Sequence, residues 1–127
     1  MTRILLAPSR YIQGPGALRE TGCHASLLGR SGLVIGGKTA LSLCYDTIAA
    51  SLVEREVACH GELFGGTSSR GEIARLADIA RTHHADFIVA LGGGASIDAG
   101  KAVAHEMNLP VIVVPTTVAT DAPCSAL

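Results

Sequence analysis

Short apolar runs alternate with segments of helical periodicity along most of this chain. The first clear run is Gly32–Gly37, "GLVIGG", which has the continuous apolar character of a buried strand and ends in two glycines. From Thr39 to Arg55 the apolar residues instead recur at helical spacing. Their shared face holds Leu41, Cys44, Ile48 and Leu52. A weaker extended segment is expected around Val57–Phe64.

A second helix is predicted behind Ser69. Ser69 and Glu72 have the S-x-x-E spacing of a capping box, in which each side chain bonds the backbone N–H of the other residue. The apolar positions that follow are Ile73, Leu76, Ala77 and Ala80. His83 and His84 close this helix, where imidazoles suit the negative end of the helix dipole.

The next stretch repeats the strand–helix–strand order. Phe87–Leu91 is a continuous apolar run, a helix is expected from Ser96 to Glu106 or Met107, and Pro110–Pro115 is the next strand. Parallel strands that are buried on both faces read as such unbroken apolar runs. The alternation therefore predicts βαβ units and a doubly wound, Rossmann-like α/β domain that spans residues 1–127.

Composition narrows the functional classes. The net charge of −1 argues against a nucleic-acid or anionic-membrane partner, and 3% aromatic residues offer no stacking platform for bases. The apolar runs are far shorter than a membrane span, and no signal-peptide pattern is present, so we expect a cytoplasmic protein. The five histidines and four cysteines show no HxxxH, HExxH or zinc-finger spacing, which predicts no metal site within this chain.

Three consecutive glycines, Gly92–Gly94, lie between a predicted parallel strand and the next helix. Backbone without β-carbons lets a phosphate approach closely, and the N–H groups of the helix start point at the anion. Ser96 is the natural N-cap candidate, and Asp98 is expected in the first turn. A tight turn with an ordinary cap is the competing interpretation. The spacing is not that of GxGxxG, since Ile97 occupies the last position.

A phosphate-loop pattern and a single aspartate each allow two interpretations. "GLVIGGKT" (Gly32–Thr39) formally fits the phosphate-binding loop of nucleotide hydrolases, but its inner residues are themselves the predicted strand and cannot wrap a phosphate. Asp121 lies in a polar loop near the end of the sequence. Its carboxylate suits either the hydroxyls of a polyol or an ordinary turn before Pro123.

Two stretches carry a resemblance to a known family. "GGGASIDAGKA" (Gly92–Ala102) resembles the glycine-rich motif of the iron- or zinc-dependent alcohol dehydrogenase superfamily, which has the dehydroquinate synthase-like fold. "PTTVATDAPCSAL" (Pro115–Leu127) is similar to a stretch found in its glycerol dehydrogenases, as is "APSRYIQGPGAL" (Ala7–Leu18).

The resemblance implies a nicotinamide cofactor, NAD with NADP as the alternative, whose pyrophosphate lies over the glycine triplet. It implies that Asp121 contacts the hydroxyls of glycerol, and that Ser125 and Leu127 lie near the nicotinamide ribose. The full set of cofactor-binding residues that we expect is Gly37, Gly93, Gly94, Ala95, Ser96, Asp98, Thr116, Thr117, Ala119, Ser125 and Leu127. A family zinc would polarise the substrate alkoxide, and glycerol would pass hydride to the nicotinamide.

This sequence departs from the family pattern in several places. Gly37 stands where family members often carry an aspartate for the adenosine ribose, Ala95 where close relatives have lysine, and Gly100 where alanine is common. Gly100 is expected to weaken its helix by up to about 1 kcal/mol relative to alanine.

The family's helical second domain supplies the metal ligands and has no counterpart in these 127 residues. We therefore expect the N-terminal piece of a glycerol dehydrogenase, with no complete catalytic set and a homo-oligomeric state once completed. The alternative is a catalytically inactive nucleotide-binding module.

Overall fold

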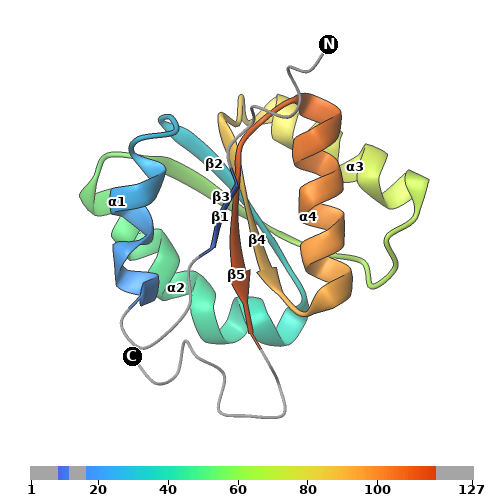
Figure 1. Ribbon diagram of the computed structural model, residues 1–127, viewed down its shortest axis with the longest axis horizontal. Coiled ribbons are helices and arrows are strands. Elements are labelled where there is room, and N and C mark those ends of the chain that lie inside the picture. Colours follow the sequence, from blue (N-terminus) through green and yellow to red (C-terminus); the bar gives the residue numbers. More distant parts are fainter. Residues whose placement is uncertain (1–8, 12–16, 117–127) are drawn as a thin grey trace.

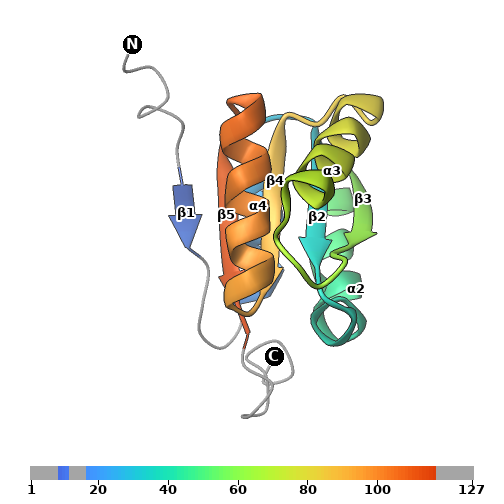
Figure 2. The ribbon, with the colours of Figure 1, turned by 90° about the vertical axis from the view of Figure 1, so that its right-hand side faces the viewer.

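A five-stranded parallel sheet forms the centre of the molecule. The computed structural model describes residues 9–11 and 17–116, and the strands lie in the order β1-β5-β4-β2-β3. Figure 2 shows β1 and β3 as the two outer strands of this sheet. The strands are β1 (Ser9–Tyr11), β2 (Ser31–Gly36), β3 (Ala58–Leu63), β4 (Phe87–Gly92) and β5 (Val111–Pro115).

Helices cover both faces of the sheet, as Figure 1 shows. α1 (Thr21–Ala25), preceded by the 3-10 turn η2 (Ala17–Glu20), lies with α2 (Lys38–Glu54) on one face. α3 (Arg70–Thr82) and α4 (Gly94–Met107) lie on the other. The result is the three-layered, doubly wound α/β architecture that the sequence predicts. Among the described residues, no helix is both long and apolar enough to cross a bilayer.

Apart from Ser31 at the start of β2, the central strands are apolar because each face of the sheet has its own core. Alternate residues of β2 and β4, such as Val34 and Val89, pack with Ile48 and Leu52 of α2. The intervening residues belong to the core under α3 and α4. That second core includes Leu33, Ile35, Ile88, Ala90, Leu76, Ala77, Ala99 and Val103.

The predicted elements are confirmed with small shifts of their ends. β2 ends at Gly36 and α2 begins at Lys38, so Gly37 is the N-cap residue of the helix and not the end of the strand. The weak segment expected around Val57–Phe64 is the outer strand β3. β1 and the Ala17–Ala25 segment carry no apolar pattern and were not expected from the sequence.

The structure contradicts the prediction that Gly100 weakens its helix relative to alanine. A β-carbon added at Gly100 would overlap the side chain of Ala90 on β4, and it would lie 3.2 Å from the Ala90 Cα. The missing side chain lets α4 pack closely on the sheet. Alanine would therefore not strengthen this helix, because close packing outweighs helix propensity at this position.

Candidate functional site

The carboxyl ends of β2 and β4 meet at the point where the direction of winding reverses. These two strands are neighbours in the sheet, with Gly36 aligned to Leu91. The chain leaves β2 into α2 on one face and leaves β4 into α4 on the other (Figure 1). In open α/β sheets, ligands bind in the crevice that such a reversal creates. Both glycine-rich segments singled out from the sequence lie at this switch point.

The turn after β4 depends on Gly92. Its φ of +125° is a conformation that side-chain-bearing residues rarely adopt, and an added β-carbon would lie 2.6 Å from the Ser96 hydroxyl oxygen. That hydroxyl donates to the carbonyls of Leu91 at 3.0 Å and Gly93 at 3.2 Å. The buried Ser96 side chain thus stabilises the turn by bonding the carbonyls on both sides of Gly92.

The structure corrects the expected cap of this helix. Gly93 is the N-cap residue of α4, and Ser96 is the third residue inside the helix, where its side chain is buried and faces the turn. Asp98 lies beyond the first turn and is exposed. The correction arises because the helix begins two residues earlier than its apolar pattern does.

Backbone N–H groups are therefore accessible where α4 starts. No side chain among the described residues caps this helix, and its first internal bond runs from the Ile97 N–H to the Gly93 carbonyl at 3.0 Å. Gly93, Gly94 and Ala95 are exposed. A β-carbon at Gly93 or Gly94 would meet nothing within 4 Å, which leaves space for a ligand against the backbone. Uncapped N–H groups and the helix dipole favour an anion there.

The start of α2 has the same construction. Gly37 is its N-cap residue, no described side chain caps it, and an added β-carbon would meet nothing within 4 Å. Lys38 and Thr39 follow in the first turn and are exposed. Two glycine-capped helix starts therefore lie at the switch point, one after each of the two neighbouring strands.

Thr116 ties the end of β5 to the same turn. It is buried, and its backbone N–H donates to the Gly92 carbonyl at 2.9 Å. The structure thus brings Gly37, Gly93, Gly94, Ala95, Ser96 and Thr116 to one edge of the sheet. The remaining predicted positions, Thr117, Ala119, Asp121, Ser125 and Leu127, lie outside the described residues.

Comparison with known proteins identifies the family. The model of the family described as "Iron-containing alcohol dehydrogenase" matches residues 8–127. The chain belongs to the iron-containing alcohol dehydrogenase family. It is 42% identical over 127 residues to a glycerol dehydrogenase of Pseudomonas putida and 39% identical to one of Escherichia coli O6:H1. Each alignment covers 100% of this chain and 35% of the relative, so the chain spans about a third of the length of these curated relatives.

Solved structures agree with this family. The glycerol dehydrogenase of Schizosaccharomyces pombe superposes with a TM-score of 0.79 at 29% identity, covering 91% of this chain and 29% of that one. A probable glycerol dehydrogenase of Sinorhizobium meliloti gives 0.75 at 29% identity, covering 91% of this chain and 31% of the other. The fold of an iron-containing alcohol dehydrogenase is therefore shared across the described sheet and its helices.

The start of α3 differs from the starts of α2 and α4. The Ser69 hydroxyl accepts from the Glu72 N–H at 3.2 Å, which is one half of the predicted capping box. The other half is absent, because the Glu72 carboxylate accepts from the Gly65 N–H at 2.7 Å instead. Hydrogen bonds from Arg75 hold the pKa of Glu72 below its ordinary value, although partial burial opposes them. One N–H group in the first turn of this helix is therefore bonded by a neighbouring side chain of the same chain.

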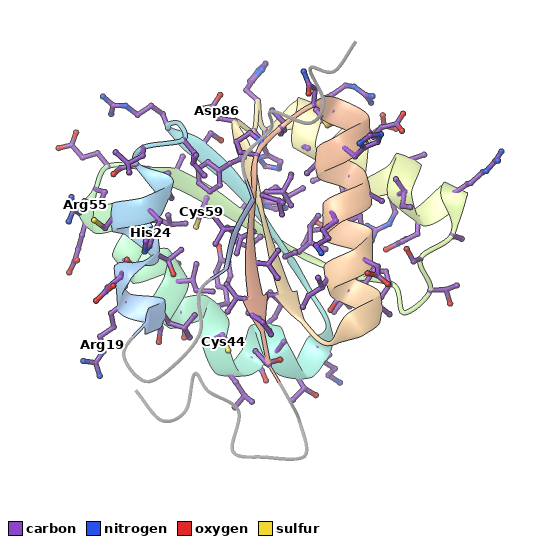
Figure 3. All side chains as sticks on the ribbon, in the orientation of Figure 1. Arg19, His24, Cys44, Arg55, Cys59 and Asp86 are labelled. Carbon is purple, nitrogen blue, oxygen red and sulfur yellow. The ribbon has the colours of Figure 1, made fainter. Side chains whose placement is uncertain are left out.

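The charged groups elsewhere on the sheet have structural partners. Asp86, at the edge opposite the glycine turns in Figure 3, accepts from the backbone N–H groups of Arg30 at 2.8 Å and Ser31 at 3.2 Å. Within the described part of the chain, no group of three His, Cys, Asp or Glu residues could hold a metal ion. The metal that the family name implies therefore has no fitting ligand set among these residues.

Proposed function

We propose that this chain is the nicotinamide-dinucleotide-binding part of a glycerol dehydrogenase-type oxidoreductase. This proposal rests on the two glycine-capped helix starts, those of α2 and α4, which lie at the switch point of the sheet. A dinucleotide has one pyrophosphate, which suits one helix start, and an adenosine ribose, which reaches the neighbouring strand end. The glycerol dehydrogenases among the relatives support the choice of this cofactor class.

The residues of this chain then have separate tasks. The N–H groups at Gly94 and Ala95 bind the pyrophosphate, and Ser96 holds the turn without touching the ligand. Bound NAD supplies the acceptor for the hydride that leaves the substrate carbon. Thr117, Ala119, Ser125 and Leu127 along the cofactor, and Asp121 at a polyol such as glycerol, are part of this proposal.

Several further properties belong to the same proposal. The described residues do not form a metal site. We propose a zinc ion only for a complete enzyme, in which residues outside the described ones would bind it. A cytoplasmic, homo-oligomeric enzyme without nucleic-acid or membrane partners completes it. The alternative is a non-catalytic nucleotide-binding module, which would bind NAD without glycerol-dependent reduction of it.

Calorimetric titration with NAD tests the cofactor site. Gly94→Asp places a carboxylate where the pyrophosphate is expected, and the open space at Gly94 accepts the side chain without overlap. We expect binding to weaken at least about tenfold, because a fixed negative charge opposes the phosphates. Gly71→Asp is the matched control: it also has open space, but it lies in the first turn of the capped helix α3. Equal affinities for the two variants would contradict the assigned site.

A finer hypothesis concerns the choice between NAD and NADP. A carboxylate at the end of β2 would accept the ribose hydroxyls and repel a 2′-phosphate. Gly37 lacks it, and the exposed Lys38 follows at a helix start, so we propose that NADP is tolerated or favoured. The competing view is that NAD binds through the glycine turn alone. Gly37→Asp should shift the affinity ratio toward NAD by about tenfold, whereas Gly37→Ala should not. An unchanged ratio for Gly37→Asp means that this position does not contact the ribose.

A further inference from the structure

The outer edge of β3 is a line of backbone groups at one side of the sheet (Figure 2). The Ala58 N–H donates to Arg30 at 2.8 Å and the Phe64 N–H to Gly36 at 2.8 Å, so the even-numbered residues of this strand point their backbone toward β2. In a parallel pair the intervening residues point the other way. The N–H and carbonyl groups of Cys59, Gly61 and Leu63 therefore face outward.

The side chains of β3 alternate between the two helical layers. Cys59 contacts the Tyr45 hydroxyl of α2 at 3.3 Å, and a β-carbon at Gly61 would meet the Tyr45 ring. His60 and Glu62 face the α3 layer instead. The His60 ring stacks on His83 with centroids 4.0 Å apart, and the two β3 side chains bond each other at 3.1 Å.

This arrangement is complementary to itself. If two β3 strands run antiparallel with Gly61 opposite Gly61, the outward groups of both glycines can exchange two hydrogen bonds. Cys59 then lies opposite Leu63 of the second copy, also as a hydrogen-bonded pair. His60 lies opposite Glu62 of the second copy as the closer, non-hydrogen-bonded pair, and oppositely charged or hydrogen-bonding pairs stabilise such positions. Within its own chain Glu62 also bonds Arg75 at 2.9 Å, so the contact between copies adds to an existing ion pair.

We propose that the outer edge of β3 binds β3 of a second copy of this chain, antiparallel and centred on Gly61, so that the two sheets become continuous. The proposal does not depend on coenzyme binding, because the edge of β3 carries neither of the two glycine-capped helix starts.

The α2 side of this edge has space for the second strand. Leu63 is a large apolar residue that is 49% exposed. Next to it lies a groove of about 550 Å³ between α2 and β3. Its walls include Leu41, Ser42, Tyr45 and Gly61, with Lys38 and Asp46 at charged positions. In the proposed pairing, Leu63 of the second copy enters beside Cys59 and closes the open side of the groove.

Arg75 limits how far the pairing extends. Its guanidinium donates to the Leu63 carbonyl at 2.9 Å, which covers the end of the exposed edge. A carbonyl has two lone pairs and can accept a second bond, so the pairing is weakened at its ends and strongest at Gly61. An interface confined to residues 59–63 of each copy is small, so the association is expected to be weak and concentration-dependent.

Site-directed disulfide formation tests the register. In a Cys23→Ser background, which removes an exposed free thiol, Leu63→Cys should form oxidised dimers. Mass spectrometry should find position 63 of one copy joined to Cys59 of the other. Within one chain these positions are about 13 Å apart on an extended strand, too far for a disulfide. Adding Cys59→Ser should abolish the dimer, and persistence of the dimer would overturn the proposed register.

Sedimentation of the full chain at micromolar to millimolar concentrations tests the association itself. His60→Glu places like charges opposite each other twice across the pair and should raise the dimer dissociation constant about tenfold. His60→Lys loses the same stacking on His83 but keeps opposite charges, so its dimer should persist; circular dichroism checks that both variants fold. A monomer throughout the range, or equal dimerisation of the two variants, would overturn the proposal.

Discussion

The starts of α3 and α4 solve the same problem in opposite ways. Each is a long helix on the same face of the sheet, with N–H groups in its first turn that need acceptors. At α3 the Ser69 hydroxyl accepts one of them, and the Glu72 carboxylate binds the preceding loop at Gly65. At α4 the N-cap residue is Gly93, and no described side chain takes part.

Under the proposed function, the difference separates a structural helix start, that of α3, from a cofactor-binding one, that of α4. Both have glycines with open space around them, Gly71 in α3 and Gly94 in α4, so glycine content alone does not distinguish them. What differs is the acceptor: at α3 the Ser69 side chain accepts from the Glu72 N–H, whereas at α4 no described side chain does so, and we propose that the cofactor takes this place. Substitutions at the two helix starts test this contrast.

Removing the glycine that shapes the α4 start should have the largest effect. Gly92→Ala combines a φ of +125° with a contact of 2.6 Å to the Ser96 oxygen. We expect a loss of about 3 kcal/mol in the free energy of unfolding, measured by urea denaturation. Gly66→Ala is the control, since Gly66 also has a positive φ but open space around it, and it should cost about 1–2 kcal/mol. Equal losses would show that the contact with Ser96 contributes nothing.

Removing the cap of α3 should have a smaller effect, on stability alone. Ser69→Ala deletes the acceptor for the Glu72 N–H and should cost about 1 kcal/mol. NAD affinity should not change, because none of the proposed cofactor-binding residues lies in α3 or in the loop before it. A change in affinity as large as that of Gly94→Asp would remove the distinction between the two helix starts.

Acid should weaken the α3 start selectively. Arg75 bonds Glu72 at 2.6 Å and Glu62 at 2.9 Å, and both carboxyls have a lowered pKa; for Glu62, burial raises the pKa but the bonds from Arg75 and His60 outweigh it. A lowered pKa contributes stability above the unfolded-state value that is lost as pH falls through the folded-state value.

Arg75→Gln should therefore cost roughly 0.5–1 kcal/mol at neutral pH and less at acidic pH, where both carboxyls are protonated. Denaturation curves at the two pH values measure the difference. The bond from Arg75 to the Leu63 carbonyl remains in acid, so a small cost should persist. A cost that grows as pH falls would contradict the assigned ion pairs.

Giving α4 a cap should have the smallest effect on stability and a clear one on binding. Gly93 has an extended backbone and open space, so Gly93→Ser can cap the helix without strain. Serine should stabilise the ligand-free chain by a few tenths of a kcal/mol, since glycine is itself a fair N-cap. It should also weaken NAD binding, because its oxygen competes for the N–H groups. Gly93→Ala lacks that oxygen and serves as the control.

The sequence predicts the buried elements well because their signals are local. β2, β4 and β5 are continuous apolar runs, and the amphipathic spacing of α2 and α3 is read within each helix. β1 could not be predicted, because Ser9–Tyr11 is only three residues long and its pairing with β5 joins segments far apart in the sequence. The sequence also predicts the glycine triplet at the end of β4. That this triplet lies beside the end of β2 follows from the order of the strands in the sheet, which the sequence does not show.

The errors at the site have a common physical cause. Ser96 was expected as a cap, but its acceptors, Leu91 and Gly93, are set by how the turn folds back on the helix. Gly100 was expected to weaken α4, but its role depends on Ala90 of the neighbouring strand. Both properties depend on contacts between elements, which spacing along one element does not reveal.

Backbone amide resonances, followed during titration with pyrophosphate and with NAD, report separately on the two helix starts. If α4 leaves its N–H groups for the dinucleotide, the amides of Gly94 and Ala95 should shift saturably with both ligands. The amides of Gly71 and Glu72 at the capped start of α3 should stay in place. Equal shifts at the two helix starts, or shifts at α3 without any at α4, would contradict the claim that the uncapped start of α4 is the binding site.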